Sequence, residues 1–329
     1  MLRLSTETAT LRLAQPFRIS GYVFETAEVL VVTLDDGTHR GRGEGAGAYY
    51  LGDDLAKMRA DVAAARAAIE AGPTREQLRA LMPAGGARNA ADAALWELEA
   101  RRSGTPVWRL AGLAEPPRPI VTTFTVSADT PEAMAAVARG YARARSIKVK
   151  LTGELALDLA RVAAIRAARP DVWLGVDGNQ GFARGELDAL VAGLLPHGVS
   201  LLEQPLARGA EAELDGYRSA IPIAGDESLL TLDDVADATG RFDVVNIKLD
   251  KCGGLTEGLL MAAAARRLGL GVMVGTMIGT SLATAPGFVL GQLADLVDLD
   301  GPTFLAGDRA PSVRYDDGLL FAGGEVWGG

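Results

Sequence analysis

The chain of 329 residues is 48% hydrophobic and 23% charged and has a formal net charge of −9, which is typical of a globular protein with one large domain or two. The negative charge argues against a general binder of nucleic acids or anionic membranes, and no apolar run is long enough to span a bilayer. Cys252 is the only cysteine, which excludes an internal disulfide and predicts a cytoplasmic protein.

The first part of the chain, residues 1–115, predicts an α+β domain. Its N-terminus alternates apolar and polar residues, which is typical of a strand and not of a signal peptide. The Asp-Gly pair in "LDDGTH" predicts a hairpin turn, and alanine-rich segments predict helices. The predicted strands are residues 2–13, 28–35 and 38–44, and the predicted helices are residues 53–71, 75–81 and 87–102.

The second part, residues 116–311, alternates short apolar strands with helical patterns. About eight such units predict a closed parallel barrel, and the rival, an open doubly wound sheet, lacks a glycine-rich turn after its first strand. The tail, residues 312–329, is expected to return to the first domain. The predicted barrel strands are residues 121–126, 146–151, 173–177, 200–203, 223–224, 244–248, 271–274 and 296–299.

Three consecutive barrel strands end in a carboxylate: Asp177, Glu203 and Asp226. Active sites of parallel barrels lie at the carboxyl ends of the strands, and neighbouring strands are about 4.8 Å apart, so the three groups can meet. Converging carboxylates require a cation or protons, and oxygen ligands without sulfur or imidazole favour Mg²⁺. The alternative is that each acid lies in a surface loop or caps a helix.

Lysines occupy the strand ends on both sides of these acids. The stretch "SIKVKLTG" alternates, so Lys148 and Lys150 share one face of the second strand, and Lys248 ends the sixth strand. The alternative is an edge strand with its lysines in water. Because lysine, three acids and lysine follow one another around the barrel, we expect the lysine face to point inward, with one amine on each side of a bound substrate.

Taken together, "KVK", "VDGNQG", "LLEQPL", "GDES" and "NIKLDKCGG" resemble the enolase superfamily in its muconate-lactonizing subgroup. The resemblance covers nearly the whole chain and implies a capping domain on a modified TIM barrel, (β/α)7β. It implies Asp177, Glu203 and Asp226 as Mg²⁺ ligands and Lys150 and Lys248 as acid/base residues. Lys148 is then expected near the substrate carboxylate. The shared chemistry is removal of a proton next to a carboxylate, through an enediolate.

The last barrel strand ends "DLDGP", which places Asp298 and Asp300 on one face. This pair resembles the dipeptide epimerases, in which it binds the ammonium group of the substrate, so we expect inversion at the C-terminal residue of a dipeptide. N-acylamino acid racemase and o-succinylbenzoate synthase activities are the alternatives on the same scaffold. A turn or capping role for the pair, a non-catalytic metal-binding barrel and a Schiff-base aldolase remain as further readings.

Two loops of the first domain, residues 15–28 and 45–54, are expected to lean over the barrel mouth. They bring Phe24 and Tyr50 to the substrate, and the loop after the seventh strand brings Met277 and Ile278. Because Phe24 stands where some dipeptide epimerases have a basic residue, a neutral or apolar second residue of the dipeptide is favoured.

The remaining residues of the motifs are expected to support the site. Asn179 and Glu227 are predicted to orient the metal ligands, and Lys251 to lie behind the site or face solvent. The glycine pair of "KCGG" is a tight turn or a phosphate cradle. The resemblance implies a small-molecule partner and allows a homo-oligomer, for which the sequence shows no interface.

Overall fold

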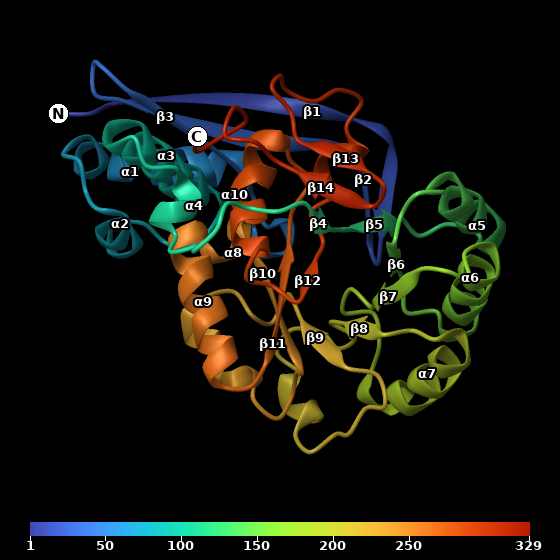
Figure 1. The fold of residues 1–329 in the computed structure, drawn as a ribbon. Helices are drawn as coiled ribbons and strands as arrows, with labels where there is room; N and C mark the ends of the chain where they lie inside the picture. The colour runs from blue at the N-terminus through green and yellow to red at the C-terminus, as the bar shows by residue number, and fades with distance from the viewer.

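The computed structural model describes residues 1–329 and contains three sheets (Figure 1). The first sheet is antiparallel, in the order β1-β2-β3. Its strands are β1 (Arg3–Ile19), β2 (Tyr22–Asp35) and β3 (Arg40–Ala46), and they are followed by η1 (Tyr49–Leu51), α1 (Leu55–Glu70), α2 (Arg75–Leu81), α3 (Gly86–Ser103) and α4 (Val107–Leu110).

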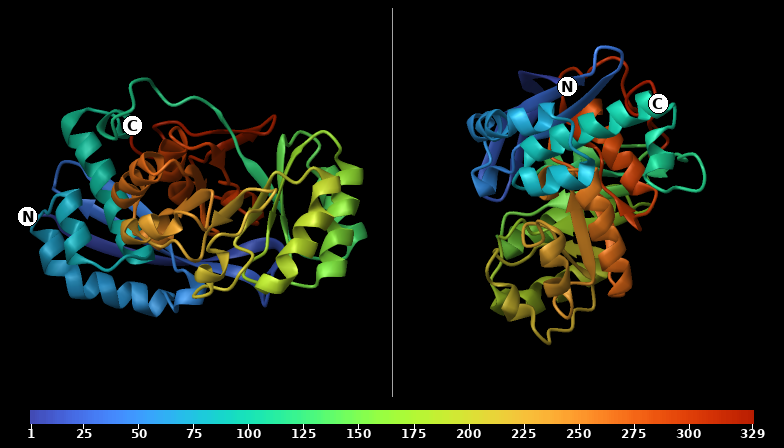
Figure 2. Two further views of the ribbon diagram at one scale, coloured as in Figure 1. Left: turned by 90° about the horizontal axis from the view of Figure 1, so that it is seen from below. Right: turned by 90° about the vertical axis from the view of Figure 1, so that its left-hand side faces the viewer.

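The predicted loop of residues 15–28 is a continuation of the β1–β2 hairpin, which corrects the sequence prediction. Phe17 pairs with Phe24 and Ile19 with Tyr22, and the register shifts between Arg12 and Phe17. A bulge of this kind lets a strand continue past an irregularity. The hairpin crosses the molecule towards α5 (Figure 2), where Ala128 N–H donates to the Arg18 carbonyl at 3.0 Å.

A stripe of glycines on β3 allows α3 to pack unusually close to the sheet. A Cβ atom at Gly41 would lie 2.0 Å from the Ala94 carbonyl oxygen, and one at Gly43 would lie 2.1 Å from that of Ala90. Side chains at these positions would therefore push the helix away. The sequence "RGRGEGA" places glycine at every second position because one face of the strand meets a helix backbone.

The second sheet is the predicted parallel barrel, in the order β12-β11-β10-β9-β8-β7-β6-β5. Its strands are β5 (Thr123–Val126), β6 (Ser146–Lys150), β7 (Trp173–Asp177), β8 (Leu201–Glu203), β9 (Ile223–Gly225), β10 (Val244–Lys248), β11 (Gly271–Gly275) and β12 (Leu296–Val297). The predicted first barrel strand, residues 121–126, breaks near its start at Thr122, because β4 (Ile120–Val121) belongs to another sheet.

Helices surround the barrel unevenly. They are α5 (Pro131–Gly140), α6 (Leu155–Ala168), α7 (Leu187–Leu194), α8 (Leu249–Cys252), α9 (Leu255–Arg267) and α10 (Ser281–Gly291). The crossovers that flank β9 contain only the 3₁₀ segments η4 (Glu211–Leu214) and η5 (Leu232–Ala238), while η2 (Arg184–Glu186), η3 (Leu195–His197) and η6 (Gly301–Phe304) are short turns elsewhere. None of the helices is long and apolar enough to cross a membrane.

Side chains and isolated amides close the barrel between its first and last strands. Leu299 N–H donates to the Thr122 hydroxyl at 2.9 Å, and Thr125 N–H donates to the Asp300 carboxylate at 2.6 Å. These bonds replace a strand ladder at the seam between β12 and β5. The residues that end the last strand therefore have a role in closing the fold as well as a position at the barrel mouth.

The tail forms the hairpin β13 (Arg314–Asp316) and β14 (Leu319–Phe321), and β14 pairs with β4 in a third sheet. The last residues then reach the first region. The Trp327 indole donates to the Arg42 carbonyl at 3.0 Å, and Val107 N–H donates to the Gly328 carbonyl at 2.8 Å. The tail thus contacts both parts of the chain.

Candidate active site

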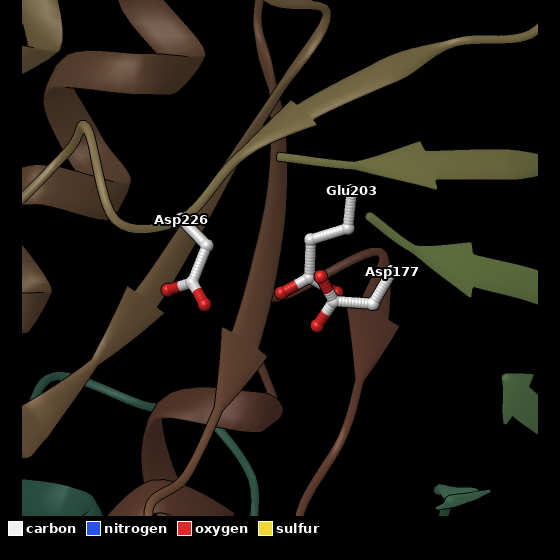
Figure 3. Close-up of side chains that lie close together, drawn as sticks. All are labelled: Asp177, Glu203 and Asp226. Carbon is white, nitrogen blue, oxygen red and sulfur yellow. The ribbon is translucent and has the colours of Figure 1, made fainter. Parts of the chain in front are cut away.

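The three acids predicted from the sequence lie together at the carboxyl ends of adjacent strands (Figure 3). The register pairs Lys150 with Asp177 and Asp177 with Glu203, and Asp226 follows β9 directly. One carboxylate oxygen from each acid lies within 4.8 Å of the others, and all three acids are fully buried. We call Asp177, Glu203 and Asp226 the acid triad.

The environment of the acid triad is that of a cation site. Burial, and then the charge of Asp177, raise the pKa of Glu203 to about 7. Burial would also raise the pKa of Asp226, but the ammonium groups of Lys248 and Lys251 outweigh burial and lower it. A hard cation relieves the repulsion among such carboxylates.

Buried polar atoms without partners also surround the acid triad. The side-chain oxygens Asn179 Oδ1, Asn246 Oδ1 and Glu227 Oε2 have no hydrogen-bond partner. Asn246 Nδ2 donates to Glu203 at 2.7 Å, and Asn179 Nδ2 lies 3.4 Å from Glu227 Oε1. Because Mg²⁺ usually keeps several water molecules, these acceptors fit the surroundings of a hydrated Mg²⁺. The donor set, which contains only oxygen, fits the same ion.

The two predicted acid/base lysines lie at opposite ends of the acid triad. Lys150 Nζ donates to Asp177 at 2.6 Å, and Lys248 Nζ donates to Asp226 at 2.7 Å. Both lysines are buried. Burial disfavours the charge of Lys248, but the surrounding acids, Asp226 first, outweigh it and raise its pKa well above the usual value. The amines thus flank the acids from two sides of the barrel mouth.

Lys148 lies deeper on the same face of β6 as Lys150. Its ammonium group donates to Asp298 and, at 3.2 Å, to Glu203. Burial opposes its charge, but Asp298 and Glu203 outweigh burial and raise the pKa of Lys148. The lysine face of "SIKVKLTG" therefore points into the barrel, and Lys148 is a fixed positive charge there.

Asp298 and Asp300 follow β12 and face the same interior. The Thr123 hydroxyl donates to Asp298 in addition to Lys148, and Asp298 has a lowered pKa because Lys148 outweighs the effect of burial. Burial, and then the charge of Asp298, raise the pKa of Asp300 to about 7. The two carboxylates differ: Asp298 is already paired with a cation, whereas Asp300 accepts hydrogen bonds from Thr125 and takes part in no ion pair.

A cavity of about 550 Å³ opens above these groups and contains the other predicted residues. Phe24 and Tyr50 contribute from the first region, and Met277 and Ile278 from the loop after β11. The walls also include residues that sequence reasoning missed, namely Phe17, Ile19, Tyr49 and Phe304. Apolar, mostly aromatic residues alternate with other residues over 17–24, which is the pattern of a strand, but Pro16 and Gly21 interrupt this pattern.

The sequence left two positions open for Lys251, behind the site or facing solvent. It is fully buried, and its ammonium group donates to Asp226 Oδ1 at 2.6 Å and to the Asn246 carbonyl at 3.1 Å. It therefore holds one oxygen of a triad acid in place while Lys248 contacts the other. Lys251 follows Lys248 by three residues, across a single helical turn, and this spacing brings both amines to one carboxylate.

The glycine pair of "KCGG" is a tight turn at which the first region docks. Gly253 has φ +80°, and a Cβ atom there would lie 2.2 Å from Arg88 Nε on α3. Arg88 Nη2 donates to the Cys252 carbonyl. The close approach of α3 explains the glycines without a phosphate ligand.

A second hollow, of about 630 Å³, lies far from the acid triad, around the β2–β3 turn and the C-terminus. Its cations are exposed and already paired: Arg40 with Asp35 at 2.6 Å and Arg101 with Glu97 at 3.1 Å. It therefore has none of the buried, unpartnered groups that distinguish the cavity above the acid triad.

Comparison with known proteins agrees with this geometry. Residues 3–112 match the N-terminal domain of the mandelate racemase / muconate lactonizing enzyme family, and residues 130–318 match the enolase C-terminal domain-like family. The L-Ala-D/L-Glu epimerase of Escherichia coli is 39% identical over 93% of this chain and 95% of its own length.

Two solved structures share the fold over almost the whole of both chains. An Agrobacterium tumefaciens enolase family member with homology to dipeptide epimerases, with bound sodium and L-Ala-L-Glu, superposes with a TM-score of 0.95 at 38% identity, covering 100% of both chains. A dipeptide epimerase from Enterococcus faecalis, complexed with Mg and L-Leu-L-Tyr, has a TM-score of 0.91 at 25% identity and covers 99% of this chain and 97% of its own. This chain therefore belongs to the mandelate racemase / muconate lactonizing enzyme family of the enolase superfamily.

Proposed function

We propose that this chain is a Mg²⁺-dependent dipeptide epimerase, an isomerase that inverts the α-carbon of the C-terminal residue of a dipeptide by two-base proton transfer through an enediolate. The observation that carries the proposal is the arrangement of Lys150 and Lys248 at opposite ends of the acid triad, inside a cavity that also contains Asp298 and Asp300. The relatives named above act on or bind dipeptides.

The acid triad would hold the metal. When bound, Mg²⁺ supplies positive charge that stabilises the carboxylate of the substrate as it gains negative charge, and it lowers the pKa of nearby amines. Asn179 and Glu227 border the triad and orient its ligands. Lys148, which stays charged beside Glu203, adds a second positive charge for the substrate carboxylate.

The two lysines move the proton. A base must be neutral when it takes a proton, and the acid on the opposite side must be charged to return one. Lys150 and Lys248 exchange these roles according to which stereoisomer is bound. Because each amine is held by one oxygen of a different triad acid, both are positioned at the edge of the same space, where the α-carbon would sit between them.

Asp298 and Asp300 supply the negative charge that binds the ammonium group of the dipeptide. Asp300 is the better candidate for direct contact because no cation is paired with it. Its raised pKa reflects a buried acid without a counterion, and a bound ammonium group would provide one. Asp298 remains engaged by Lys148.

The seam contacts favour one second candidate, an N-acylamino acid racemase. Asp298 and Asp300 already bond to Thr123 and Thr125 and so help to close the barrel, a role that requires no substrate ammonium. Asp300→Asn retains an acceptor for Thr125 and removes only the charge. The epimerase proposal expects this variant to lose dipeptide turnover at least about 100-fold while acylated substrates are unaffected; equal turnover of both classes would favour the racemase.

A dipeptide library in D₂O, read by mass spectrometry for deuterium at the α-carbon, tests the proposal directly. Dipeptides should gain one deuterium in the C-terminal residue, EDTA should abolish the gain, and added Mg²⁺ should restore it. N-acetyl and N-succinyl amino acids are the matched substrates without an ammonium group. Exchange confined to these acylated compounds would overturn the dipeptide assignment, and Mg²⁺-independent exchange would overturn the role of the triad.

We also propose a division into a capping domain, residues 1–115, and a barrel domain, residues 116–311, with the tail 312–329 bridging them. Two apolar clusters support this division. One lies between the first sheet and α1–α3, and the other is centred on the barrel and also takes in a few residues of the first region where the two parts meet, Val31, Ala93, Trp96, Ala100 and Val107. We further propose a cytoplasmic location, which the buried free thiol of Cys252 supports.

A further inference from the structure

We propose that Tyr315, in the C-terminal hairpin, is a positioning residue that holds Asp300 in place for the ammonium group of the dipeptide. The inference rests on the proposed function and deepens it. Tyr315 does not line the cavity and acts through the Leu299 carbonyl, to which its hydroxyl donates at 2.6 Å. The hairpin of β13 and β14 thereby contributes to the choice of a substrate with a free ammonium group.

The segment that carries Asp300 leaves the barrel ladder before it reaches this residue. β12 ends at Val297, and Asp298 N–H still donates to the Val274 carbonyl at 2.8 Å. No strand pairs with β12 on its other side, because β12 and β5 are the two ends of the strand order. The backbone at Leu299 and Asp300 therefore depends on partners from outside the ladder.

Both polar groups of the Leu299 backbone have such partners. Leu299 is 1% exposed, and buried backbone groups need hydrogen bonds. Its N–H donates to the Thr122 hydroxyl at 2.9 Å, and its carbonyl accepts from the Tyr315 hydroxyl. Because the Leu299 carbonyl and the Asp300 N–H belong to one planar peptide group, the bond from Tyr315 fixes the rotation of the plane to which the Asp300 α-carbon is attached.

The Asp300 carboxylate needs this fixed backbone. Thr125 N–H donates to the carboxylate at 2.6 Å, across the seam of the barrel, while the charge of Asp298 acts against it. No ion pair holds the carboxylate, so its direction depends on Thr125 and on its own main chain. A binding group is effective when its supporting contacts hold it in the productive geometry. Loss of the bond at Leu299 would let the peptide rotate and move the charge away from the ammonium group.

Tyr315 is itself firmly held. It pairs with Leu320 of β14, and Leu320 pairs with Ile120 of β4, directly before the first barrel strand (Figure 1). Its ring packs edge-to-face on Phe124 of β5, with ring centroids 6.0 Å apart. Burial, and then the charge of Asp300, raise the pKa of Tyr315 well above its usual value. The hydroxyl therefore keeps its proton and remains a donor to the carbonyl.

Tyr141 provides a matched control on the other side of Phe124. The ring centroids of Tyr141 and Phe124 are 5.3 Å apart, and the Tyr141 hydroxyl donates to the Thr125 carbonyl at 3.3 Å. That carbonyl belongs to the peptide group after Thr125, whereas the amide that bonds to Asp300 belongs to the peptide group before it. Tyr141→Phe therefore removes a hydroxyl from the same aromatic cluster without releasing the Asp300 peptide.

The test compares kcat/KM for α-deuteration of a dipeptide and of its hydroxyl analogue, L-Ala-L-Leu and L-lactoyl-L-leucine. If another C-terminal residue exchanges faster in the dipeptide library, both compounds carry that residue. The wild-type protein should prefer the dipeptide by about 100-fold or more. Tyr315→Phe should lower this ratio about 5-fold, through a higher KM for the dipeptide at an unchanged kcat, and Tyr141→Phe should leave the ratio unchanged.

A double-mutant cycle tests whether Tyr315 acts through Asp300. Asp300→Asn alone should remove the preference for the ammonium group. When Tyr315→Phe is added to Asp300→Asn, the ratio should not fall further, because the two residues act as a unit. A further fall of about 5-fold would show that Tyr315 acts independently of Asp300 and would contradict the positioning role.

The outcomes also separate this inference from the proposed function. If the wild-type protein exchanges the α-proton of no dipeptide, or of dipeptide and hydroxyl analogue equally well, the dipeptide assignment fails and the role of Tyr315 fails with it. If the wild-type protein prefers the dipeptide but Tyr315→Phe keeps the wild-type ratio, the epimerase stands and the positioning role is overturned. An equal fall of the ratio in Tyr315→Phe and Tyr141→Phe would assign the effect to the aromatic cluster as a whole and would also overturn it.

Discussion

Lys150 and Lys248, the proposed acid/base residues, stand on halves of the barrel that are supported in different ways. Beyond Lys150, the loop after β6 is held by its own half: Asp158 on α6 accepts from Thr152 N–H at 3.0 Å and from Gly153 N–H at 2.9 Å. Arg161, on the same helix, donates to Asp158 at 2.7 Å. The support of this lysine is therefore local in sequence.

Beyond Lys248, the turn after β10 is held by the capping region. Asp250 accepts from Ala46 N–H at 2.9 Å and from the Asn89 side chain at 2.8 Å. Asp92 on α3 accepts from Thr256 N–H at 3.0 Å. In Figure 2 the capping helices lie against the orange α9 side, and α5–α7 lie on the opposite side. The strand end at Lys150 is thus supported by a helix of the barrel, and the strand end at Lys248 by the capping region.

The largest expected effect comes from removing either lysine. It tests whether the two differently supported halves contribute equally to proton transfer. Lys150→Ala and Lys248→Ala should each reduce epimerisation by at least about 10³-fold, because each removes one of the two proposed proton-transfer groups. Each variant should still exchange the α-proton of one stereoisomer with D₂O, and the two variants should exchange opposite stereoisomers. Full exchange of both stereoisomers by either variant would contradict the two-base arrangement.

The second prediction separates local from interdomain support. Asp158→Ala leaves buried Arg161 without its ion-pair partner and should lower the free energy of unfolding by about 3–5 kcal/mol. Hydrogen exchange should then increase around residues 151–161. Asp250→Ala should instead increase exchange at residues 46–52 and 86–92, in the capping region. If the same peptides exchanged faster in both variants, the two halves of the barrel would not differ in how they are supported.

The third prediction concerns the docking turn. Gly253→Ala should cost about 3 kcal/mol, because a left-handed conformation strains a Cβ-bearing residue and the new Cβ atom meets Arg88 at 2.2 Å. Gly240 has the same φ of +80° but nothing within 4 Å of its Cβ position, so Gly240→Ala should cost only about 1–2 kcal/mol. Chemical denaturation measures the free energy of unfolding of both variants. Equal losses would show that backbone strain alone, without the contact with Arg88, accounts for the effect at Gly253.

The smallest expected effect is a pH dependence of the interdomain support. Burial raises the pKa of Asp92 to about 6 although Thr256 donates to it, so the folded protein binds this proton more tightly than the unfolded chain. The contribution of Asp92 to stability is therefore greatest at low pH and falls as the pH rises from about 4 to 6, by at most about 1.4 kcal/mol per pH unit. Asp92→Asn should flatten that decline in thermal unfolding; an unchanged slope would assign the decline to another group.

The sequence predicted the barrel, the acid triad and the three lysines because these features depend on local patterns. Alternation in "SIKVKLTG" fixed one face of a strand, and a carboxylate recurred at the same position of three successive strands. The hairpin of residues 15–28 was missed because Pro16 and Gly21 interrupt the alternation, while the pairing that extends the strand is supplied by Phe24 across the turn. The burial and ion pairing of Lys251 were likewise missed, because this residue lies within a polar motif.

The sequence by itself determined the chemistry of the rim, since the residue at the end of each parallel strand is set by the period of that strand and all such ends meet at one edge. Only the tertiary structure decided which groups meet across the chain. Asp298 finds Thr123, Asp250 finds Ala46, and Phe24 comes to lie over the lysines. These contacts depend on the packing of the capping region on the barrel and on the closure of the barrel between its first and last strands. No pattern within a single segment predicts them.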